Sequence, residues 1–192
     1  MPDNTAIRLA RLEVEVPELF DRGQAGTVLY VGACPQRCDY MVDLHAVGHE
    51  LTVLEIWEEN IEALEESPFR RYFAHIMLGD VRQLATTRLP YRTYDFTFWW
   101  HGPEHLNCPG IAPAVQALEA LTRKTVILGS PWGVYRSGAV WGNPYNTHLC
   151  HLYQQDYMQL GYEVATLGSK DKRGSCLLAW RCLTREAQGE AS

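Results

Sequence analysis

The sequence predicts an α/β domain with a doubly wound, mostly parallel seven-stranded sheet, and three observations support this. Short apolar runs alternate with helical segments, the pattern of strands joined by crossover helices. Residues 94–100 (YDFTFWW) are almost unbroken in hydrophobicity, as expected of a central parallel strand. Residues 162–167 and 176–182 are spaced as a hairpin pair. We therefore expect an antiparallel C-terminal hairpin strand at one side of the sheet.

The first half of the domain is predicted from turn and cap signals. Residues 27–31 (TVLYV) form a strand that ends at Gly32. A helix over 39–47 stops at Gly48, because glycine suits the left-handed position after a helix. Residues 51–56 (LTVLEI) form the second strand. The helix over 58–67 is acidic in its first turn, as the helix dipole favours, and Pro68 closes it.

The second half continues the alternation. A short third strand ends at Leu78, and residues 125–128 form the fifth strand. A long loop over 129–145 leads to a helix that ends at 160–161. The helix between the fourth and fifth strands keeps one apolar face, formed by Ile111, Val115, Leu118 and Leu121.

The chain length suits one domain. A fold of 192 residues buries roughly 70% of its unfolded surface. We expect a helical or irregular segment over 1–26, the α/β domain over 27–183 and a flexible tail over 184–192.

Composition narrows the partners and the location. The net charge is -6, from 17 basic and 23 acidic residues without a basic cluster, so we expect no nucleic-acid partner. No apolar run approaches the ~18 residues of a membrane span, and we expect no membrane association. The six cysteines are scattered and no signal peptide precedes them, so we expect reduced thiols and a cytoplasmic location.

Four motifs carry a family resemblance. VLYVGA (28–33), LEIWEEN (54–60), GDV (79–81) and YDFTFWW (94–100) have the order and spacing of the motifs of class I S-adenosylmethionine (SAM) dependent methyltransferases. The resemblance covers about residues 27–183. The later GNPYNTH and LGY, followed by the closing hairpin, are similar to a subgroup of small members. The resemblance implies a Rossmann-like fold and SAM as the cofactor.

The resemblance also implies roles for the strand ends. Glu55 would accept hydrogen bonds from the ribose hydroxyls, although a strand-end glutamate is also a common exposed residue. Ile56 and Trp57 would cover the adenine, unless Trp57 belongs to the core. Asp80 and Val81 would meet the adenine amino group and ring, whereas the alternative for Asp80 is a turn or cap. The implied cofactor-binding residues are Tyr30, Gly32, Ala33, Cys34, Glu55, Ile56, Trp57, Asp80, Val81, Trp99 and Trp100.

The first loop departs from the family pattern. Tyr30 stands where the family usually has an acid, and Gly32 is the one glycine left. Pro35 removes a backbone donor. These losses would damage a dinucleotide site, because a pyrophosphate needs close backbone approach at a helix N-terminus. SAM has no phosphate, so the same losses in the first loop would damage a SAM site less.

The segment after the fourth strand is the predicted catalytic region. The aromatic faces of Trp99 and Trp100 would attract a sulfonium. His101 could act as a general base, since its ordinary pKa lies near neutrality, and Glu104 could orient it or bind an amine. Alternatively, Glu104 and His105 simply start the next helix behind a proline. The predicted catalytic residues are His101, Glu104 and His105.

Two patterns in the sequence are similar to metal-binding motifs, but neither fits well enough to predict a metal site. The string HGPEH (101–105) fits H-x-x-E-H literally, but that signature needs a continuous helix, which Gly102-Pro103 disfavours. His148 and His151 lack a CxxC pair or a clear third ligand. We therefore predict no metal.

The long loop is predicted to cover an acceptor. Loops of this length without structure of their own are usually functional or disordered, and its aromatic content argues against disorder. Its NPY (143–145) lies beyond the fifth strand, not after the fourth as in amino-group DNA methyltransferases. The predicted substrate-binding residues are Trp132, Tyr135, Tyr145 and His148.

These expectations favour methyl transfer from SAM to a small polar molecule. The alternative from another class is a non-catalytic SAM- or nucleoside-binding protein that keeps the fold, which the altered first loop supports. A nicotinamide oxidoreductase is disfavoured because the sequence lacks G-x-G-x-x-G. Metal-dependent hydrolysis is the fourth hypothesis.

Overall fold

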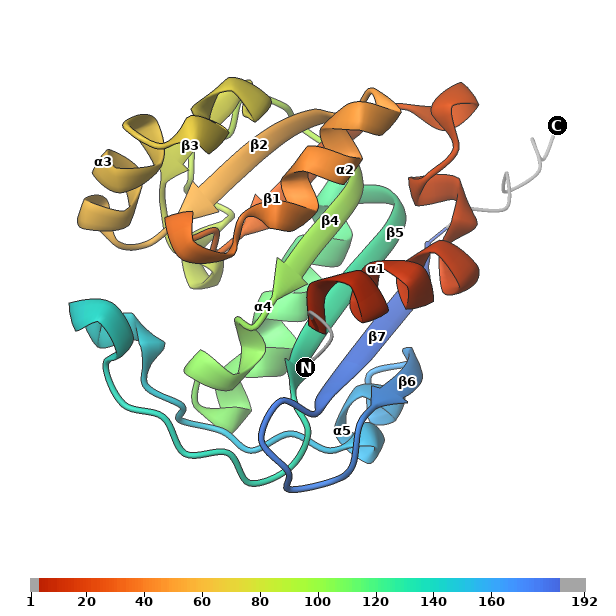
Figure 1. The fold of residues 1–192 in the computed structure, drawn as a ribbon, viewed down its shortest axis with the longest axis vertical. Coiled ribbons are helices and arrows are strands. Elements are labelled where there is room, and N and C mark those ends of the chain that lie inside the picture. Colours follow the sequence, from red (N-terminus) through yellow and green to blue (C-terminus); the bar gives the residue numbers. More distant parts are fainter. Residues whose placement is uncertain (1–3, 184–192) are drawn as a thin grey trace, which may run out of the picture.

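The structure is a computed structural model that describes residues 4–183, and it contains one mixed sheet of seven strands (Figure 1). The predicted tail over 184–192 lies outside the described residues. The strands are β1 (Thr27–Val31), β2 (Glu50–Glu55), β3 (His75–Leu78), β4 (Tyr94–Trp100), β5 (Thr122–Pro131), β6 (Glu163–Leu167) and β7 (Cys176–Cys182). Their order across the sheet is β3-β2-β1-β4-β5-β7-β6, which confirms the predicted fold class.

The strand directions confirm the predicted hairpin ending. Strands β1 to β5 pair in parallel, and β7 runs antiparallel to both β5 and β6. From β1 the chain winds outward to β2 and β3, then returns to place β4 on the other side of β1. The carboxyl ends of β1 and β4 are therefore a topological switch point, where open α/β sheets bind ligands.

Helices cover both faces of the sheet (Figure 1). One buried cluster joins the sheet to α1 (Asn4–Glu15), α2 (Asp39–Val47) and α3 (Glu58–Glu65), through residues such as Leu12, Met41 and Leu64. The second cluster joins the other face to α4 (Cys108–Leu121) and α5 (Gln154–Gln159), through Val115 and Tyr157 among others. The apolar spacing predicted for α4 is confirmed, since Ile111, Val115 and Leu118 are all buried.

Boundaries differ from the prediction where tertiary pairing decides them. Strand β5 spans ten residues and not four, because β7 pairs along it from Thr125 to Pro131. Residues 103–105 form a 3₁₀ turn, and α4 begins only at Cys108. The alternative in which Glu104 and His105 start a helix behind Pro103 therefore holds for this short 3₁₀ turn but not for α4.

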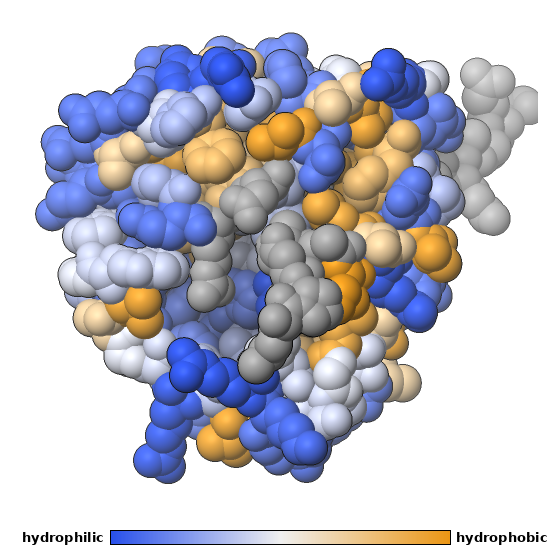
Figure 2. Space-filling view, in the orientation of Figure 1, coloured by the Kyte–Doolittle hydropathy of each residue, from blue (hydrophilic) through white to orange (hydrophobic). Residues whose placement is uncertain are grey.

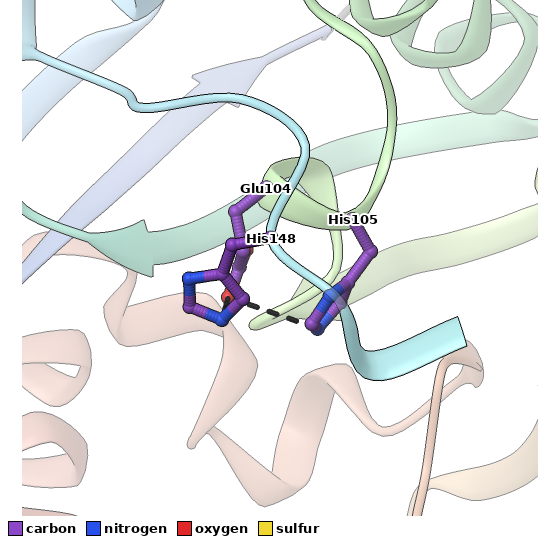
Figure 3. A group of neighbouring side chains, drawn as sticks. All are labelled: Glu104, His105 and His148. Atoms are coloured by element: carbon purple, nitrogen blue, oxygen red, sulfur yellow. Dashed lines mark ion pairs between the residues drawn. The ribbon is translucent and has the colours of Figure 1, made fainter. Parts of the chain in front are cut away.

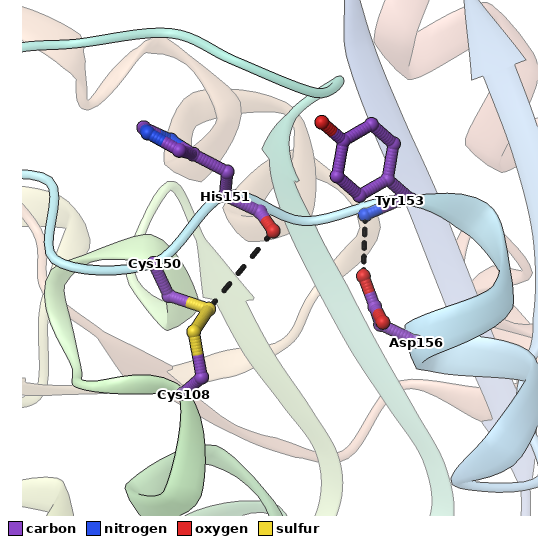
Figure 4. Close-up of a disulfide and its surroundings, with 5 residues drawn as sticks. All are labelled: Cys108, Cys150, His151, Tyr153 and Asp156. Atoms are coloured by element: carbon purple, nitrogen blue, oxygen red, sulfur yellow. Dashed lines mark hydrogen bonds between the residues drawn. A yellow bond between two sulfur atoms is a disulfide. The ribbon is translucent and has the colours of Figure 1, made fainter.

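The expectation of reduced thiols is wrong for one pair of cysteines. Cys108 at the start of α4 forms a disulfide with Cys150, 42 residues later (Figure 4). No local pattern in the sequence indicates this pair, because the two residues meet only when the loop after β5 folds back over α4. Among the described residues, no helix is long and apolar enough to cross a membrane.

Candidate functional site

A cavity of about 1140 Å³ opens at the carboxyl rim of β1, β2 and β4. It lies between this rim, α1 and the loop that follows β5, and Figure 2 shows a recess on this face whose visible walls are mainly hydrophilic. Most of the predicted site residues line it, although they come from segments far apart in the chain. Those that line it are Tyr30, Gly32, Cys34, Glu55, Ile56, Asp80, Val81, Trp99, Trp100, His101, Glu104, His105, Tyr135, Tyr145 and His148.

Glu55 is the buried carboxylate of this cavity. It is the last residue of β2 and is 3% exposed. Its Oε1 accepts a hydrogen bond from the backbone N–H of Trp57 at 3.0 Å. Burial raises the pKa of Glu55 to about 7, although hydrogen bonds from Trp57, the Asn60 side chain and the backbone of Ile56 oppose the shift. The carboxylate can therefore accept hydrogen bonds from a ligand at neutral pH, and a ligand that donates to it favours its charged form.

Asp80 follows β3 on the same rim. Its Oδ1 accepts from the backbone N–H of Arg82 at 2.9 Å, which caps a short 3₁₀ turn. Burial would raise the pKa of Asp80, but hydrogen bonds from the side chain and backbone of Arg82 outweigh it and lower the pKa. The capping alternative weighed for Asp80 is thus correct, and the residue also lines the cavity beside Val81.

The first loop leaves room at the rim. Gly32 has a φ of 78°, a left-handed conformation that glycine adopts without strain, and a Cβ built there would meet nothing within 4 Å. Its N–H donates to the carbonyl of Leu54, which joins the loop to β2. Ala33, by contrast, is fully buried in the core and is not among the cavity-lining residues.

Two tryptophans end β4 and fix the backbone around them. A Cβ on Gly102 would lie 1.6 Å from Trp99 Nε1, and one on Gly129 would lie 2.2 Å from Trp100. Trp100 stacks on Phe98 with a centroid distance of 5.8 Å. Both indoles line the cavity while contributing to the two buried clusters. The neighbouring glycines are therefore required by close packing.

His101 adopts an uncommon backbone conformation directly after β4. Its φ is 53°, in the left-handed region that few residues other than glycine adopt. Its N–H donates to the carbonyl of Gly129 at 2.9 Å, and its Nδ1 lies 3.2 Å from Oε1 of Glu104. Because a carboxylate oxygen accepts, this contact assigns the Nδ1 proton and leaves a lone pair on Nε2. Strained backbone of this kind is frequent at functional sites.

Glu104 is the centre of a histidine cluster. It is 2% exposed, and its Oε1 lies 4.0 Å from Nε2 of both His105 and His148 (Figure 3). His148 comes from the loop after β5, whereas Glu104 and His105 belong to the 3₁₀ turn after β4. The sequence suggested these residues separately, and the fold brings them together.

The predicted loop lines the cavity only in part. Tyr135 packs on His148, with ring centroids 5.5 Å apart, and Tyr145 lines the cavity while half exposed. Trp132 lies outside the lining and packs against the core cluster of α4 and α5. Trp57 is also outside it, and its contact with Glu55 is through its backbone.

Sequence reasoning missed Arg8. This residue of α1 is buried, and its Nη1 donates to the hydroxyl of Tyr40 at 3.1 Å while its guanidinium lies 5.2 Å from the Trp100 ring. Within residues 4–183 no carboxylate forms an ion pair with it, and its Nε lacks a hydrogen-bond partner there. Arg8 lines the cavity, so an anionic ligand group could pair with it. No motif marked it, because it lies outside the segment that resembles the methyltransferases.

Comparisons with known proteins address the fold. No family model matches the chain, and no curated protein matches it. Magnesium protoporphyrin IX methyltransferase from Synechocystis PCC 6803, solved with bound SAH, is similar with a TM-score of 0.61 and 13% identity over 93% of this chain and 81% of that one. The N-methyltransferase NodS from Bradyrhizobium japonicum WM9 gives 0.59 and 14%, over 95% and 98%.

A third structure carries a different name. It comes from Rhodobacter sphaeroides, is provisionally named for Zn-dependent alcohol dehydrogenases, and matches with a TM-score of 0.63 and 11% identity over 88% of each chain. Identities this low establish the fold alone. The chain has the Rossmann-like fold of class I SAM-dependent methyltransferases.

Proposed function

We propose that this protein binds SAM and transfers its methyl group to a small polar acceptor. The observation that carries the proposal is the Glu55 carboxylate, buried at the end of β2 in the same cavity as Gly32, Asp80 and the β4 tryptophans. A ribose diol offers two donors to such a carboxylate. Support also comes from the fold, which similar structures share with SAH or SAM bound.

The remaining parts of SAM would find complementary groups in the cavity. Val81 and Ile56 offer apolar contacts for the adenine, and Asp80 an acceptor for its amino group. The guanidinium of Arg8 would pair with the methionine carboxylate. The indole faces of Trp99 and Trp100 would lie near the sulfonium, where their quadrupoles favour a cation.

Methyl transfer in this site would depend mainly on positioning. SAM, held by Glu55 and its neighbours in the cavity, would supply a sulfonium methyl group to the acceptor, with SAH as the other product. Holding the two reacting atoms in near-attack geometry supplies most of the acceleration. His101, oriented by Glu104, would take the proton of a hydroxyl acceptor, whereas an amine could lose its proton to water. His105, Tyr135, Tyr145 and His148 border the space for the acceptor.

Calorimetric titration with SAM and SAH tests the proposal. We expect micromolar affinity for the wild type, on the order of -8 kcal/mol. Glu55→Ala should weaken binding by at least ~1.5 kcal/mol, since hydrogen bonds to a buried charged group are worth about that. The matched control is Glu50→Ala, because Glu50 begins the same strand at the opposite, exposed rim. Equal affinities for the wild type and Glu55→Ala would contradict the ribose role.

A second candidate is a SAM-binding protein without turnover. It is favoured by the first loop, which lacks the acid and most glycines of the family and contains Pro35. SAM binding with no methylated product across a panel of hydroxyl, thiol and amine acceptors would select it.

We further propose a cytoplasmic location and no nucleic-acid or membrane partner, in keeping with the acidic composition. The disulfide tests the location, because a reducing cytosol keeps thiols reduced. Thiol titration of the protein isolated under alkylating conditions would show whether Cys108 and Cys150 are paired in the cell.

A further inference from the structure

A cluster of three potential metal ligands lies on the acceptor side of the cavity. Glu104, His105 and His148 each present one ligand atom, and these atoms all lie within 4.8 Å of one another (Figure 3). Oε1 of Glu104 is 4.0 Å from Nε2 of His105 and 4.0 Å from Nε2 of His148. These separations are longer than hydrogen bonds and fall at the limit of an ion pair, and the two imidazole rings pack edge to face with centroids 5.1 Å apart.

The hydrogen bonds on the far side of each ring assign the tautomers. Nδ1 of His105 contacts the carbonyl of Thr147 at 3.2 Å, and Nδ1 of His148 contacts the carbonyl of Tyr135 at 2.6 Å. A carbonyl only accepts, so each Nδ1 carries the proton. In the neutral rings both Nε2 atoms then carry lone pairs, and both lie on the side of the Glu104 carboxylate. Metal-binding histidines are held in this way by backbone carbonyls.

The space between the three atoms suits a small divalent ion. A point equidistant from atoms separated by 4.0, 4.0 and at most 4.8 Å lies at most about 2.5 Å from each. Side-chain movements of about 0.4 Å would give the Zn–N and Zn–O distances of roughly 2.0–2.2 Å found in proteins. Two imidazoles and one carboxylate are a ligand set used by Zn²⁺ and Fe²⁺.

Charge favours a cation at the same place. The carboxylate of Glu104 is 2% exposed, and a buried carboxylate is costly unless positive charge or hydrogen bonds compensate it. His101 approaches Oε1 through Nδ1 at 3.2 Å and can orient the carboxylate while a second lone pair binds an ion. A dication between Glu104 and two neutral imidazoles would add positive charge beside this buried carboxylate and would use the lone pairs of both Nε2 atoms.

The fold holds the two ligand-bearing segments against each other. The backbone carbonyl of Glu104 accepts from the N–H groups of Leu149 at 2.8 Å and Cys150 at 3.1 Å. The disulfide then joins Cys150, two residues after His148, to Cys108, three residues after His105. The positions of the ligands are thus fixed by backbone and covalent contacts before any ion enters.

We infer that Glu104, His105 and His148 bind one divalent transition-metal ion, with Zn²⁺ as the first candidate. All three residues line the cavity, so a coordination position remains accessible to an acceptor molecule. Three protein ligands with one open position are typical of catalytic zinc sites. The ion would bind an acceptor oxygen or sulfur and lower its pKa beside the methyl donor. That role rests on the proposed function, whereas the metal site itself does not.

The test is metal binding by the intact protein after treatment with a chelator. Zn²⁺ is titrated calorimetrically, and Co²⁺ is followed by its visible absorption, both in the absence of SAM. We expect one equivalent to bind to the wild type. His148→Ala and Glu104→Gln should weaken binding by at least ~100-fold, because even changes to the outer partners of metal ligands cost 10–100-fold. The second variant keeps the shape of the buried side chain.

The matched control is His75→Ala. Its Nε2 lies 3.8 Å from Oε1 of Glu50, so the histidine–carboxylate pair is similar, but it stands at the amino end of β3 away from the cavity. This variant should bind Zn²⁺ as the wild type does. Circular dichroism checks that each variant is folded.

Two results would overturn the inference. One is a wild type that does not bind either ion, or binds it as tightly as the two ligand variants do. The other is a Co²⁺ spectrum with thiolate-to-cobalt absorption, which would locate the ion at cysteines. SAM affinity, measured on the same proteins, should be unchanged by His148→Ala. A wild type that binds Zn²⁺ but does not bind SAM would overturn the proposed function without contradicting the metal site.

Discussion

Replacing Glu55 by glutamine should change the pH dependence of stability. Burial raises the pKa of Glu55 from 4.5 to about 7 in the folded protein. A difference of 2.5 units corresponds to about 3 kcal/mol, at 1.36 kcal/mol per unit. This is the free energy by which ionising the carboxyl in its cavity costs more than ionising it in the unfolded chain.

The direction in which the stability changes with pH follows from proton linkage. The folded protein keeps the Glu55 proton to higher pH than the unfolded chain does. The protonated carboxyl therefore stabilises the folded state at low pH, and ionisation at alkaline pH removes that stabilisation. That stabilisation is complete below about pH 4.5, falls progressively as the pH rises, and is gone above about pH 7. Glutamine does not titrate, so Glu55→Gln lacks this loss.

Thermal unfolding of the ligand-free protein between pH 4 and pH 8.5 measures the effect. We expect the free energy of unfolding of Glu55→Gln, relative to wild type, to rise by about 3 kcal/mol across this range. For a chain of this size that equals a relative gain in Tm of about 6–12 °C. Glu62→Gln is the control, because its side chain is exposed in the middle of α3. Parallel pH profiles for Glu55→Gln and wild type would refute the buried, pKa-shifted carboxylate.

Other substitutions test the remaining contacts. Arg8→Met should weaken SAH binding in calorimetry by about 1.5–3 kcal/mol, because a charge-assisted hydrogen bond to the ligand carboxylate is lost; unchanged affinity would remove Arg8 from the site. Cys150→Ser opens a 42-residue loop and should lower the free energy of unfolding in urea by about 4 kcal/mol, and reductant should destabilise the wild type but not the variant. Gly102→Ala forces a methyl group into Trp99 and should cost about 1–3 kcal/mol in thermal unfolding, whereas Gly138→Ala, where a Cβ meets nothing within 4 Å, should cost far less; similar losses in both would argue against the close packing.

Part of the site was predictable because it follows strand ends. Glu55 is the last residue of β2 and Asp80 lies two residues after the end of β3, and parallel strands present their carboxyl ends at one rim whatever surrounds them. The family motifs added the chemistry expected at those positions. The sequence also places Trp57 and Trp132 at the site, but neither lines the cavity, and Trp132 packs against the core cluster of α4 and α5 because an apolar side chain serves a core as readily as a pocket.

The alternation of strands and helices, the closing hairpin and the rim that carries Glu55 and Asp80 can be predicted from the amino-acid sequence, because periodicity and turn residues act locally. Three further features depend on the folded arrangement: Arg8 reaches the cavity, Cys108 pairs with Cys150, and His148 joins Glu104 and His105. These groups meet through long-range packing of α1 and of the loop after β5. No local pattern encodes such contacts, since they depend on where distant segments are held by the whole sheet.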